Sequence, residues 1–194
     1  MSETKIISIA ACGARRELGL KGGLPWTNKE DLKWFREKTV GSIVIMGRLT
    51  FESLNGGLKD RINVVVTSKD VLEGVKQPTI TTTSLENAIA TAAKLSKGKP
   101  IFIIGGYKIF QEALEKDLVD VEYITFHHKE YEADTFYPYY ERDNLCERTT
   151  VAEYNLEDGT QVTVWENKYE GNGIKNLGLS DIPSNKLTIN PGFE

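Results

Sequence analysis

The segment Asn28-Lys-Glu-Asp-Leu-Lys-Trp-Phe-Arg-Glu-Lys38 places an acidic residue among large apolar ones. Successive residues advance by about 100° around a helix, so Asp31, Leu32, Trp34 and Phe35 share one arc and polar residues fill the opposite one. A carboxylate on the apolar arc is costly unless it finds hydrogen-bond donors or a ligand. The alternative is a first-turn aspartate that favours the helix dipole and turns toward water. The segment therefore predicts an amphipathic helix with an acid that either binds a ligand or faces solvent.

The segment before this helix is a glycine-rich loop. It reads Leu18-Gly-Leu-Lys-Gly-Gly-Leu-Pro-Trp26 and carries several apolar side chains. Such a loop can close over a flat ligand and exclude water. Taken alone, the same composition is more typical of an ordinary connector.

Farther out, apolar and β-branched runs alternate with helix-like segments. Several runs are continuous rather than alternating, which is typical of strands covered on both faces. The alternation predicts an α/β fold, in which a central, mostly parallel sheet is flanked by helices. For the third helix, Ser84 is the expected N-cap and Gly98 the expected stop. The predicted strands are Ile6–Ala11, Ser42–Met46, Ile62–Thr67, Ile101–Ile104, Val121–Phe126 and Val162–Trp165, and the predicted helices are Asn28–Lys38, Thr50–Leu54, Leu85–Lys97 and Tyr107–Glu115.

The chain has 194 residues, which suits one domain with an appended tail. No repeat or low-complexity tract interrupts residues 1–170, which we expect to form the single catalytic domain. Residues 171–194 are polar and punctuated by glycine and proline. We expect this C-terminal tail to be extended or disordered.

Composition excludes several classes of function. The formal net charge of −4 argues against nucleic-acid binding, which requires a basic surface. No stretch is apolar enough for a membrane span, and the N-terminus lacks the pattern of a secretory signal. The two cysteines and two histidines have no metal-ligand spacing, so we expect no metal site. A reduced, cytoplasmic setting follows from the same low cysteine count.

Four blocks of residues, in order and spacing, resemble the dihydrofolate reductase family. The first runs from Ile9-Ala10-Ala11 through Gly23-Leu24-Pro25-Trp26 to Asp31-Leu32-x-x-Phe35. The others are Met46-Gly47-Arg48-x-Thr50-Phe51-Glu52-Ser53, Ile103-Ile104-Gly105-Gly106 and Asp134-Thr135-x-Tyr137-Pro138. Any one block is weak, but four in sequence order over residues 5–169 are highly specific. The resemblance implies the family's single α/β domain with an antiparallel C-terminal strand.

The resemblance implies a role for several residues around the substrate. A carboxylate at position 31 can accept two parallel hydrogen bonds from a pterin ring, with Thr125 supporting it. Arg61 matches the arginine that holds the substrate's glutamate carboxylate, a task that suits a planar guanidinium. From the residues alone, other interpretations remain open: Thr125 could be an ordinary strand residue, Arg61 could be a solvated loop residue, and the apolar positions could simply pack in the core. The expected catalytic residues are Asp31, Thr125, Trp26 and Leu24, and the expected substrate-binding residues are Ala10, Ala11, Asp31, Leu32, Phe35, Leu54, Arg61, Ile104 and Thr125.

For the cofactor, the resemblance points to NADPH at two helix starts. Gly105-Gly106 permits a close backbone approach or a cis bond, and the helix start beyond it can receive phosphate oxygens. Thr67-Ser68-Lys69 and Arg48 favour NADPH over NADH. Leu49 and Phe110 depart from the polar residue and tyrosine that many relatives carry there. The expected cofactor-binding residues are Ala11, Leu18, Gly19, Gly47, Arg48, Leu49, Thr50, Thr67, Ser68, Lys69, Ile104, Gly105, Gly106, Tyr107, Lys108, Ile109 and Phe110.

The implied reaction is hydride transfer from NADPH to C6 of 7,8-dihydrofolate, with protonation at N5, to give tetrahydrofolate for one-carbon and thymidylate metabolism. Asp31 would be the single ionisable group in contact with the pterin, in an enzyme that acts as a monomer and binds antifolates. One alternative is a pyrimidinone reductase of riboflavin biosynthesis, which shares the fold but does not use the acid at position 31. The other is a non-catalytic folate- or nucleotide-binding component.

Overall fold

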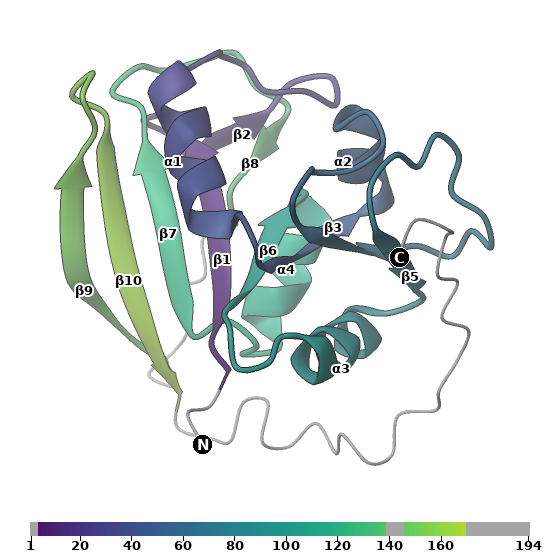
Figure 1. Cartoon of the computed structure of the whole chain (residues 1–194). Coiled ribbons are helices and arrows are strands. Elements are labelled where there is room, and N and C mark those ends of the chain that lie inside the picture. Colours follow the sequence, from purple (N-terminus) through teal and green to yellow (C-terminus); the bar gives the residue numbers. More distant parts are fainter. Residues whose placement is uncertain (1–3, 139–145, 170–194) are drawn as a thin grey trace.

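A computed structural model describes residues 4–138 and 146–169 and shows an eight-stranded sheet through the middle of the molecule (Figure 1). The strand order is β5-β4-β3-β6-β1-β7-β10-β9. Neighbouring strands run parallel from β5 to β7, and β10 pairs antiparallel with both β7 and β9. A small two-stranded sheet joins β2 and β8. The elements are β1 Ile6–Cys12, β2 Glu17–Gly19, α1 Lys29–Thr39, β3 Ile43–Gly47, α2 Arg48–Ser53, β4 Ile62–Val66, β5 Thr79–Thr82, α3 Leu85–Leu95, β6 Ile101–Gly105, α4 Tyr107–Glu115, β7 Val121–Phe126, β8 Thr135–Phe136, β9 Cys146–Asn155 and β10 Gln161–Tyr169.

The sheet separates two apolar clusters because successive side chains on a strand point to opposite faces. On one face, residues of α3 and α4 such as Leu85, Ile89 and Phe110 pack against Ile6 and Ile103. The opposite face is covered by α1 and α2, and the cluster there is made of Ile7, Ile9, Val44, Met46, Phe51, Val65, Leu72 and Phe102. Burial on both faces explains the continuous apolar runs of the central strands. The predicted α/β class, with its antiparallel C-terminal strand, is confirmed.

The parallel strands β1, β3, β6 and β7 end at one edge of the sheet. Loops and helix starts that follow these strands therefore meet there, as in open α/β sheets generally. The α1 and α2 helices begin near this edge, which is the upper end of the molecule in Figure 1. The fold thus brings together the four blocks that are far apart in the sequence.

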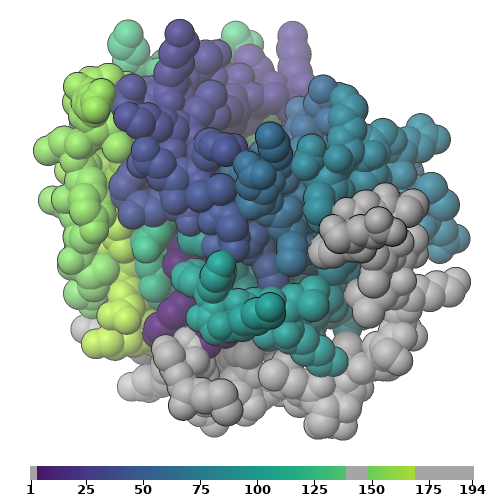
Figure 2. All heavy atoms as spheres, in the orientation of Figure 1, coloured from purple at the N-terminus to yellow at the C-terminus, as the bar shows by residue number. Residues whose placement is uncertain are grey.

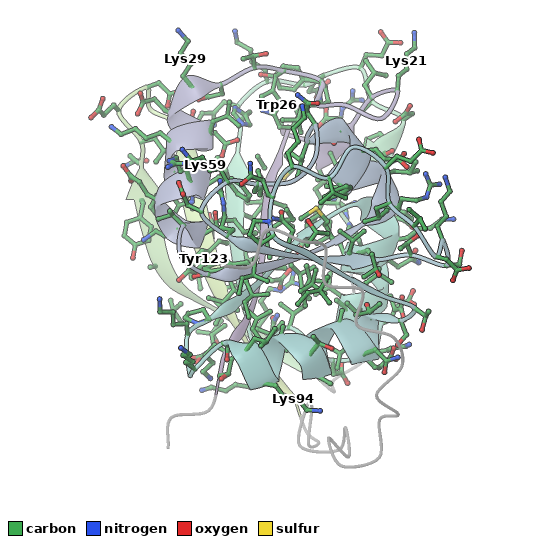
Figure 3. The ribbon with its side chains drawn as sticks, turned by 45° about the vertical axis from the view of Figure 1, so that its right-hand side comes forward. Lys21, Trp26, Lys29, Lys59, Lys94 and Tyr123 are labelled. Atoms are coloured by element: carbon green, nitrogen blue, oxygen red, sulfur yellow. The ribbon has the colours of Figure 1, made fainter. Side chains whose placement is uncertain are left out.

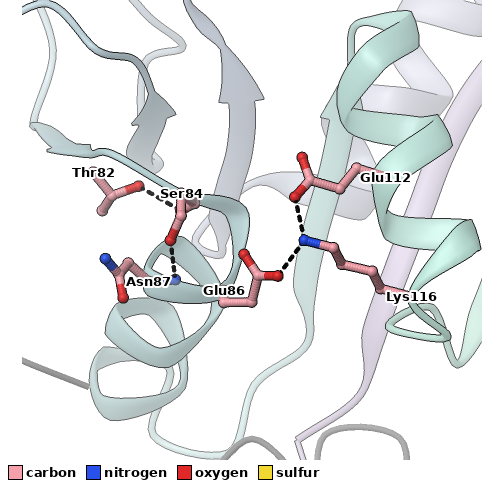
Figure 4. Close-up of polar contacts among 6 residues, drawn as sticks. All are labelled: Thr82, Ser84, Glu86, Asn87, Glu112 and Lys116. Atoms are coloured by element: carbon pink, nitrogen blue, oxygen red, sulfur yellow. Dashed lines mark hydrogen bonds and ion pairs between the residues drawn. The ribbon is translucent and has the colours of Figure 1, made fainter. Parts of the chain in front are cut away.

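The α3 helix begins as the sequence predicts and ends earlier. The Ser84 hydroxyl accepts the N–H of Asn87, which satisfies one of the free donors at the helix start (Figure 4). The helix ends at Leu95, with Ser96 as its C-cap, so the predicted end at Lys97 was wrong. Gly98 follows beyond the cap with φ of 82°, the left-handed conformation that glycine favours.

Ion pairs link α3 to α4 on the exposed side of the molecule. Lys116, the C-cap of α4, binds Glu112 of α4 at 2.7 Å and also contacts Glu86 in the first turn of α3 (Figure 4). Burial raises the pKa of Glu86, but the bond from Lys116 outweighs it and holds that pKa below its ordinary value. The pair adds to the packing of the two helices on one face of the sheet.

The sequence missed four strands. β2 and β8 are only three and two residues long, and β5 (Thr79–Thr82) is a short threonine-rich edge strand. β9 (Cys146–Asn155) is polar and forms the other edge. Edge strands need not be continuous apolar runs, because natural edge strands are often short and carry polar or charged residues. The α2 helix also begins at Arg48, two residues before its predicted start.

A buried polar network fastens the antiparallel edge to the parallel sheet. Glu122 of β7 is fully buried and accepts bonds from Arg148 (2.8 Å), Tyr137 (2.8 Å) and Asn167 (2.9 Å). The Tyr137 hydroxyl also lies 2.9 Å from that of Ser8 on β1. A buried charge is tolerated when its lone pairs are satisfied, as here. These bonds set the position of β9 and β10 beside β7.

The expected tail, residues 171–194, lies outside the described residues. Among the described helices none is long and apolar enough to cross a membrane. Residues 4–138 and 146–169 also contain no cluster of three or more histidine, cysteine or acidic residues that could hold a metal ion.

Candidate active site

Asp31 lies in the first turn of α1 and is only 7% exposed. The side chain of Asn28, the N-cap, accepts the Asp31 N–H at 2.9 Å, which fixes the start of the helix. The Asn28 amide in turn donates to Asp158 and Thr160 of the turn between β9 and β10. The helix start is therefore anchored to the neighbouring hairpin, and the alternative in which Asp31 turns toward water is wrong.

The expected substrate residues of β1, β6 and β7 reach the carboxyl edge of the sheet. Thr125 is buried on β7 and is paired in register with Ala11 of β1. Alternation along the strands places Ala11, Thr125 and Ile104 on the face that α1 covers. Ala10 points to the opposite face, where it packs against the α3 and α4 cluster. Of the expected substrate residues on strands, Ala10 therefore lies on the face of the sheet opposite α1, unlike Ala11, Ile104 and Thr125.

Apolar side chains border the same edge. Phe35 of α1 and Leu54, the C-cap of α2, pack against the cluster beneath α1. Leu24 and Leu32 are 56% and 49% exposed, which is high for large apolar residues. In Figure 2 the surface is hollowed between the atoms of α1 and those of the segment that follows α2. Exposed leucines of this kind form a surface that a flat apolar ligand can cover.

Arg61 lies under the far end of α1. It is 7% exposed, and it donates through Nε to the Lys59 carbonyl (2.9 Å) and through one terminal nitrogen to the Thr39 hydroxyl (3.0 Å). Its guanidinium carbon is 5.9 Å from the Phe35 ring centroid. Burial lowers the pKa of Arg61 from its ordinary value. Two bonds hold the guanidinium in place, and a planar fork retains further donors for a carboxylate.

The glycine-rich loop between β2 and α1 folds into a tight turn. Leu20 and Gly23 exchange backbone hydrogen bonds of 2.9 and 3.0 Å, and Lys21 and Gly22 between them have φ of 49° and 80°, as in a type I′ turn. The Lys21 N–H donates to the exposed carboxylate of Asp134 at 2.8 Å, which ties the turn to the loop before β8. In Figure 3 Lys21 projects from the outer end of the molecule, and Trp26 lies farther in, between α1 and α2 in that view.

The base of this loop is held by a buried acid. The Glu17 carboxylate accepts the N–H groups of Arg15 (2.7 Å) and Tyr131 (3.0 Å) and is fully buried. Burial raises the pKa of Glu17, but these backbone donors outweigh it and keep the pKa below its ordinary value. Glu17 therefore joins the two loops that flank Trp26.

The glycine pair after β6 is tightly packed against both helix starts. The Gly105–Gly106 peptide is cis, as the resemblance implied. A Cβ added at Gly105 would lie 3.2 Å from the Phe110 ring, and one at Gly106 would lie 3.2 Å from the Thr50 hydroxyl. At Gly47 an added Cβ would meet Ile109 at 3.3 Å. The expected cofactor residues of α2 and α4 are thus brought together around backbone that leaves no room for side chains.

The charged residues that are expected to bind the cofactor lie at the surface of the molecule. Arg48 forms an ion pair with Glu52, with 2.6 Å between Arg48 Nη1 and Glu52 Oε1. The Thr67 hydroxyl accepts the Lys69 N–H at 3.1 Å, so that it shapes the turn after β4. Several other residues expected to bind the cofactor are exposed: Leu49, Ser68, Lys69, Tyr107 and Lys108. Leu18 packs against the α3 and α4 cluster, and Gly19 pairs with Thr135 of β8.

Sequence reasoning missed His127, which lies beside Asp31. The distance from His127 Nε2 to Asp31 Oδ2 is 3.9 Å, and His127 is 6% exposed. Its ring centroid is 4.6 Å from that of Trp26. The available signal was strand alternation: His127 follows Thr125 by two residues and so points to the same side of the sheet. The sequence analysis considered His127 only as a possible metal ligand and set it aside, because no second ligand lies at a suitable spacing in the sequence.

Comparisons with known proteins agree with this arrangement. The family model described as dihydrofolate reductase matches residues 5–169. The chain is 35% identical over 130 residues to the dihydrofolate reductase of Haemophilus influenzae, covering 67% of this chain and 76% of that one. It is 36% identical over 141 residues to that of Schistosoma mansoni, covering 66% and 75%. It is 42% identical over 108 residues to the dihydrofolate reductase of Buchnera aphidicola subsp. Acyrthosiphon pisum, covering 55% of this chain and 63% of that one.

A solved structure gives the same result. The dihydrofolate reductase of Enterococcus faecalis, in a complex with NADP(H) and RAB-propyl, superposes with a TM-score of 0.69 at 29% identity, over 84% of this chain and 96% of that one. Fold, site and comparisons together define an α/β oxidoreductase. The chain belongs to the dihydrofolate reductase family.

Proposed function

We propose that this protein reduces 7,8-dihydrofolate to 5,6,7,8-tetrahydrofolate with NADPH, delivering hydride to C6 and a proton to N5. The observation that carries the proposal is the buried Asp31 side chain at the start of α1, a helix start that the Asn28 cap fixes near the edge of the sheet where the Gly105–Gly106 backbone also emerges. A buried carboxylate suits a ring that presents two parallel N–H donors. The product would supply one-carbon and thymidylate metabolism.

On the substrate side, the chain's own residues orient the pterin. Asp31 would accept hydrogen bonds from the pterin ring N–H and its exocyclic amine, which fixes the ring relative to the glycine pair. Phe35, Leu54 and Ile104 offer apolar contacts on either side of a flat ligand. The free donors of Arg61 suit the carboxylate of the glutamate tail. Alignment in a site from which water is excluded is the main catalytic contribution of such residues.

The residues on the cofactor side fit NADPH. A cradle that an added Cβ would fill, formed by Gly105, Gly106 and Gly47, allows a ligand to approach the backbone closely. The start of α4 offers unpaired N–H groups for phosphate oxygens. Lys69 and Ser68 at the rim suit the adenosine 2′-phosphate. Bound NADPH supplies the hydride, and the chain holds the reacting rings together.

The test is an assay of NADPH consumption, with dihydrofolate and a ribosylamino-pyrimidinone as competing candidate substrates. We expect turnover with dihydrofolate and none with the pyrimidinone. Turnover of the pyrimidinone alone would overturn the proposal, and loss of all turnover in a folded protein would point to a binding component. An antifolate that occupies the pterin site should inhibit the reaction.

Three further parts of the proposal concern the chain as a whole. We infer that residues 1–170 form the catalytic domain, which the family match over residues 5–169 supports. We also infer that the enzyme acts as a monomer. A cytoplasmic location is supported by the free, buried Cys12. Size-exclusion chromatography with light scattering would test the monomer.

A further inference from the structure

His127 has a buried nitrogen that the protein does not satisfy. The backbone N–H of His127 donates to the Cys12 carbonyl at 2.9 Å, which extends the pairing of β7 with β1 by one residue. Its Nε2 atom is buried and has no hydrogen-bond partner within residues 4–138 and 146–169. Buried polar atoms are nearly always paired, so one that is not calls for an explanation. The Asp31 carboxylate lies beside it, with Oδ2 3.9 Å away.

Packing holds the His127 ring in this position. The Trp26 ring lies against it with centroids 4.6 Å apart, and the Tyr131 ring meets it edge-on at 6.4 Å. Tyr131 is itself fixed, because its N–H donates to Glu17. The imidazole cannot leave the carboxylate without disturbing these aromatic contacts. Its direction toward Asp31 is therefore built into the fold.

Two carboxylates lie near the His127 ring. Asp31 on α1 is one carboxylate, and Asp158 in the turn between β9 and β10 is a second. The pKa of Asp158 lies below its ordinary value, chiefly because of the Thr160 backbone N–H, with a smaller contribution from His127. The Tyr131 ring also meets His127, and the buried Cys12 is its neighbour in the strand pairing. Burial raises the pKa of Cys12 to about 12, so this thiol carries no charge near neutral pH.

We propose that His127 is a positioning residue that acts through Asp31: its imidazole, when it carries a proton, stabilises the Asp31 carboxylate and so opposes protonation at the pterin end of the site. The inference rests on the proposed function for its kinetic consequence, but not for the coupling itself. Opposite charges within 4 to 6 Å stabilise each other's charged forms by about one to three pH units. A carboxylate beside an imidazolium is therefore protonated at lower pH, and so is a pterin nitrogen bound to that carboxylate. The site accordingly has two ionisable groups, whereas the resemblance implied Asp31 alone.

The coupling can be measured without any assay of activity. His127 and His128 are the only histidines of the chain, and His128 is exposed. An NMR titration of the imidazole signals in the full-length protein should therefore give two curves. We expect Asp31→Asn to lower the midpoint of the His127 curve by about one pH unit and to leave His128 in place. An unchanged His127 midpoint would overturn the coupling, whatever reaction the protein catalyses.

The kinetic consequence is tested by the pH dependence of hydride transfer in single turnovers with NADPH and dihydrofolate. The reaction takes up a proton, so its rate falls as pH rises. We expect His127→Phe, which keeps an aromatic ring against Trp26 and lacks nitrogens, to move the midpoint of this fall upward by about one pH unit. His127→Gln, which can still donate but carries no charge, should move it less, and His128→Gln should not move it.

The outcomes separate a positioning role from a structural one. A merely structural role would lower the plateau rate of His127→Phe and leave the midpoint in place, and that result would overturn the proposal. If the wild-type protein does not turn over dihydrofolate at all, the proposed function fails, while the NMR titration still decides the coupling.

Discussion

The substrate side and the cofactor side of the site are built from different kinds of residues. On the expected substrate side, Asp31, His127 and Arg61 are charged or titratable side chains that are at least nine-tenths buried. Around the expected nicotinamide position, glycines pack so closely that an added Cβ would lie 3.2 Å from its neighbours. The lysines on that side, Lys69 and Lys108, are exposed.

The difference determines which substitutions each side tolerates. Buried charges interact strongly because little water screens them, so the substrate side should respond to changes of charge at constant shape. The glycine cradle carries no charge and should respond to changes of volume at constant charge. Exposed lysines are screened by solvent and should matter least.

Asp31→Asn, a change of charge at nearly constant shape, should have the largest effect. We expect the rate of hydride transfer at neutral pH to fall by about 10²- to 10⁴-fold, because the carboxylate that orients and polarises the pterin is lost. The Kd for NADPH should not change. Stopped-flow kinetics and a fluorescence titration measure the two quantities. Glu37→Gln removes the same charge from the exposed side of α1 and is the control; equal rates in both variants would contradict the role of Asp31.

Arg61→Met should raise KM for dihydrofolate by about 10- to 100-fold, since bonds to charged groups are each worth about 1.5–3 kcal/mol. A dihydropterin without the glutamate tail should be reduced equally well by both proteins. Arg36→Met, which removes an exposed arginine paired with Asp60 at 3.1 Å, is the matched control. If the variant lost activity equally with both substrates, Arg61 would act through the fold rather than through the tail.

Gly105→Ala tests the cradle. Gly105 has φ of 122°, and the new methyl group would meet the Phe110 ring at 3.2 Å, so we expect a loss of about 1–3 kcal/mol in the free energy of unfolding and weaker NADPH binding. Urea denaturation and a binding titration measure these changes. Gly159→Ala has positive φ of 84° with nothing within 4 Å, and so isolates backbone strain from contact. Equal losses in the two variants would show that close packing at Gly105 has no role.

Glu17→Gln tests whether the buried Glu17 charge at the base of the glycine-rich loop stabilises the fold, through the pH dependence of that stability. The folded-state pKa of Glu17 is below the ordinary value of 4.5, so its contribution to stability is complete above that pH and disappears as pH falls through the folded-state pKa. We expect the variant to lose about 1 kcal/mol at pH 7 and progressively less as pH falls through the folded-state pKa toward pH 3, because the wild-type group contributes less as it becomes protonated. Urea unfolding at both pH values gives the comparison. A loss that is the same at pH 7 and pH 3 would exclude the charge as its cause.

Lys69→Ala should have the smallest effect. Since exposed ion pairs contribute about 0.2–1 kcal/mol, we expect the Kd for NADPH to rise by about two- to fivefold and the Kd for NADH to stay the same. Isothermal titration calorimetry at low salt measures both. A parallel change for both nucleotides would show that Lys69 does not interact with the 2′-phosphate.

Much of the fold could be predicted because the central strands are continuous apolar runs and the helices have clear starts. The Ser84 cap, the α1 wheel with Asp31 on its buried side, and the antiparallel last strand all follow from local patterns or the family resemblance. The edge strands β5 and β9 could not be found in this way. The described part of β9 is largely exposed and β5 is a four-residue, threonine-rich strand, so neither shows the apolar run that marks the central strands.

The residues of the candidate site also differ in whether the sequence alone identifies them. Gly105-Gly106 and Asp31 are marked by residue type at a fixed local spacing, so a sequence reader can select them. His127 is an ordinary strand residue until β7 is placed beside β1 and under α1, which requires pairing between residues more than a hundred positions apart.

The sequence by itself determined the class of fold, the family and the acid on the buried face of α1, because each depends on periodicity or on motifs within a few tens of residues. Only the tertiary structure decided which groups surround that acid. Distances such as the 3.9 Å between Asp31 and His127 arise from the packing of a helix against a strand distant in the chain, and no local pattern encodes them.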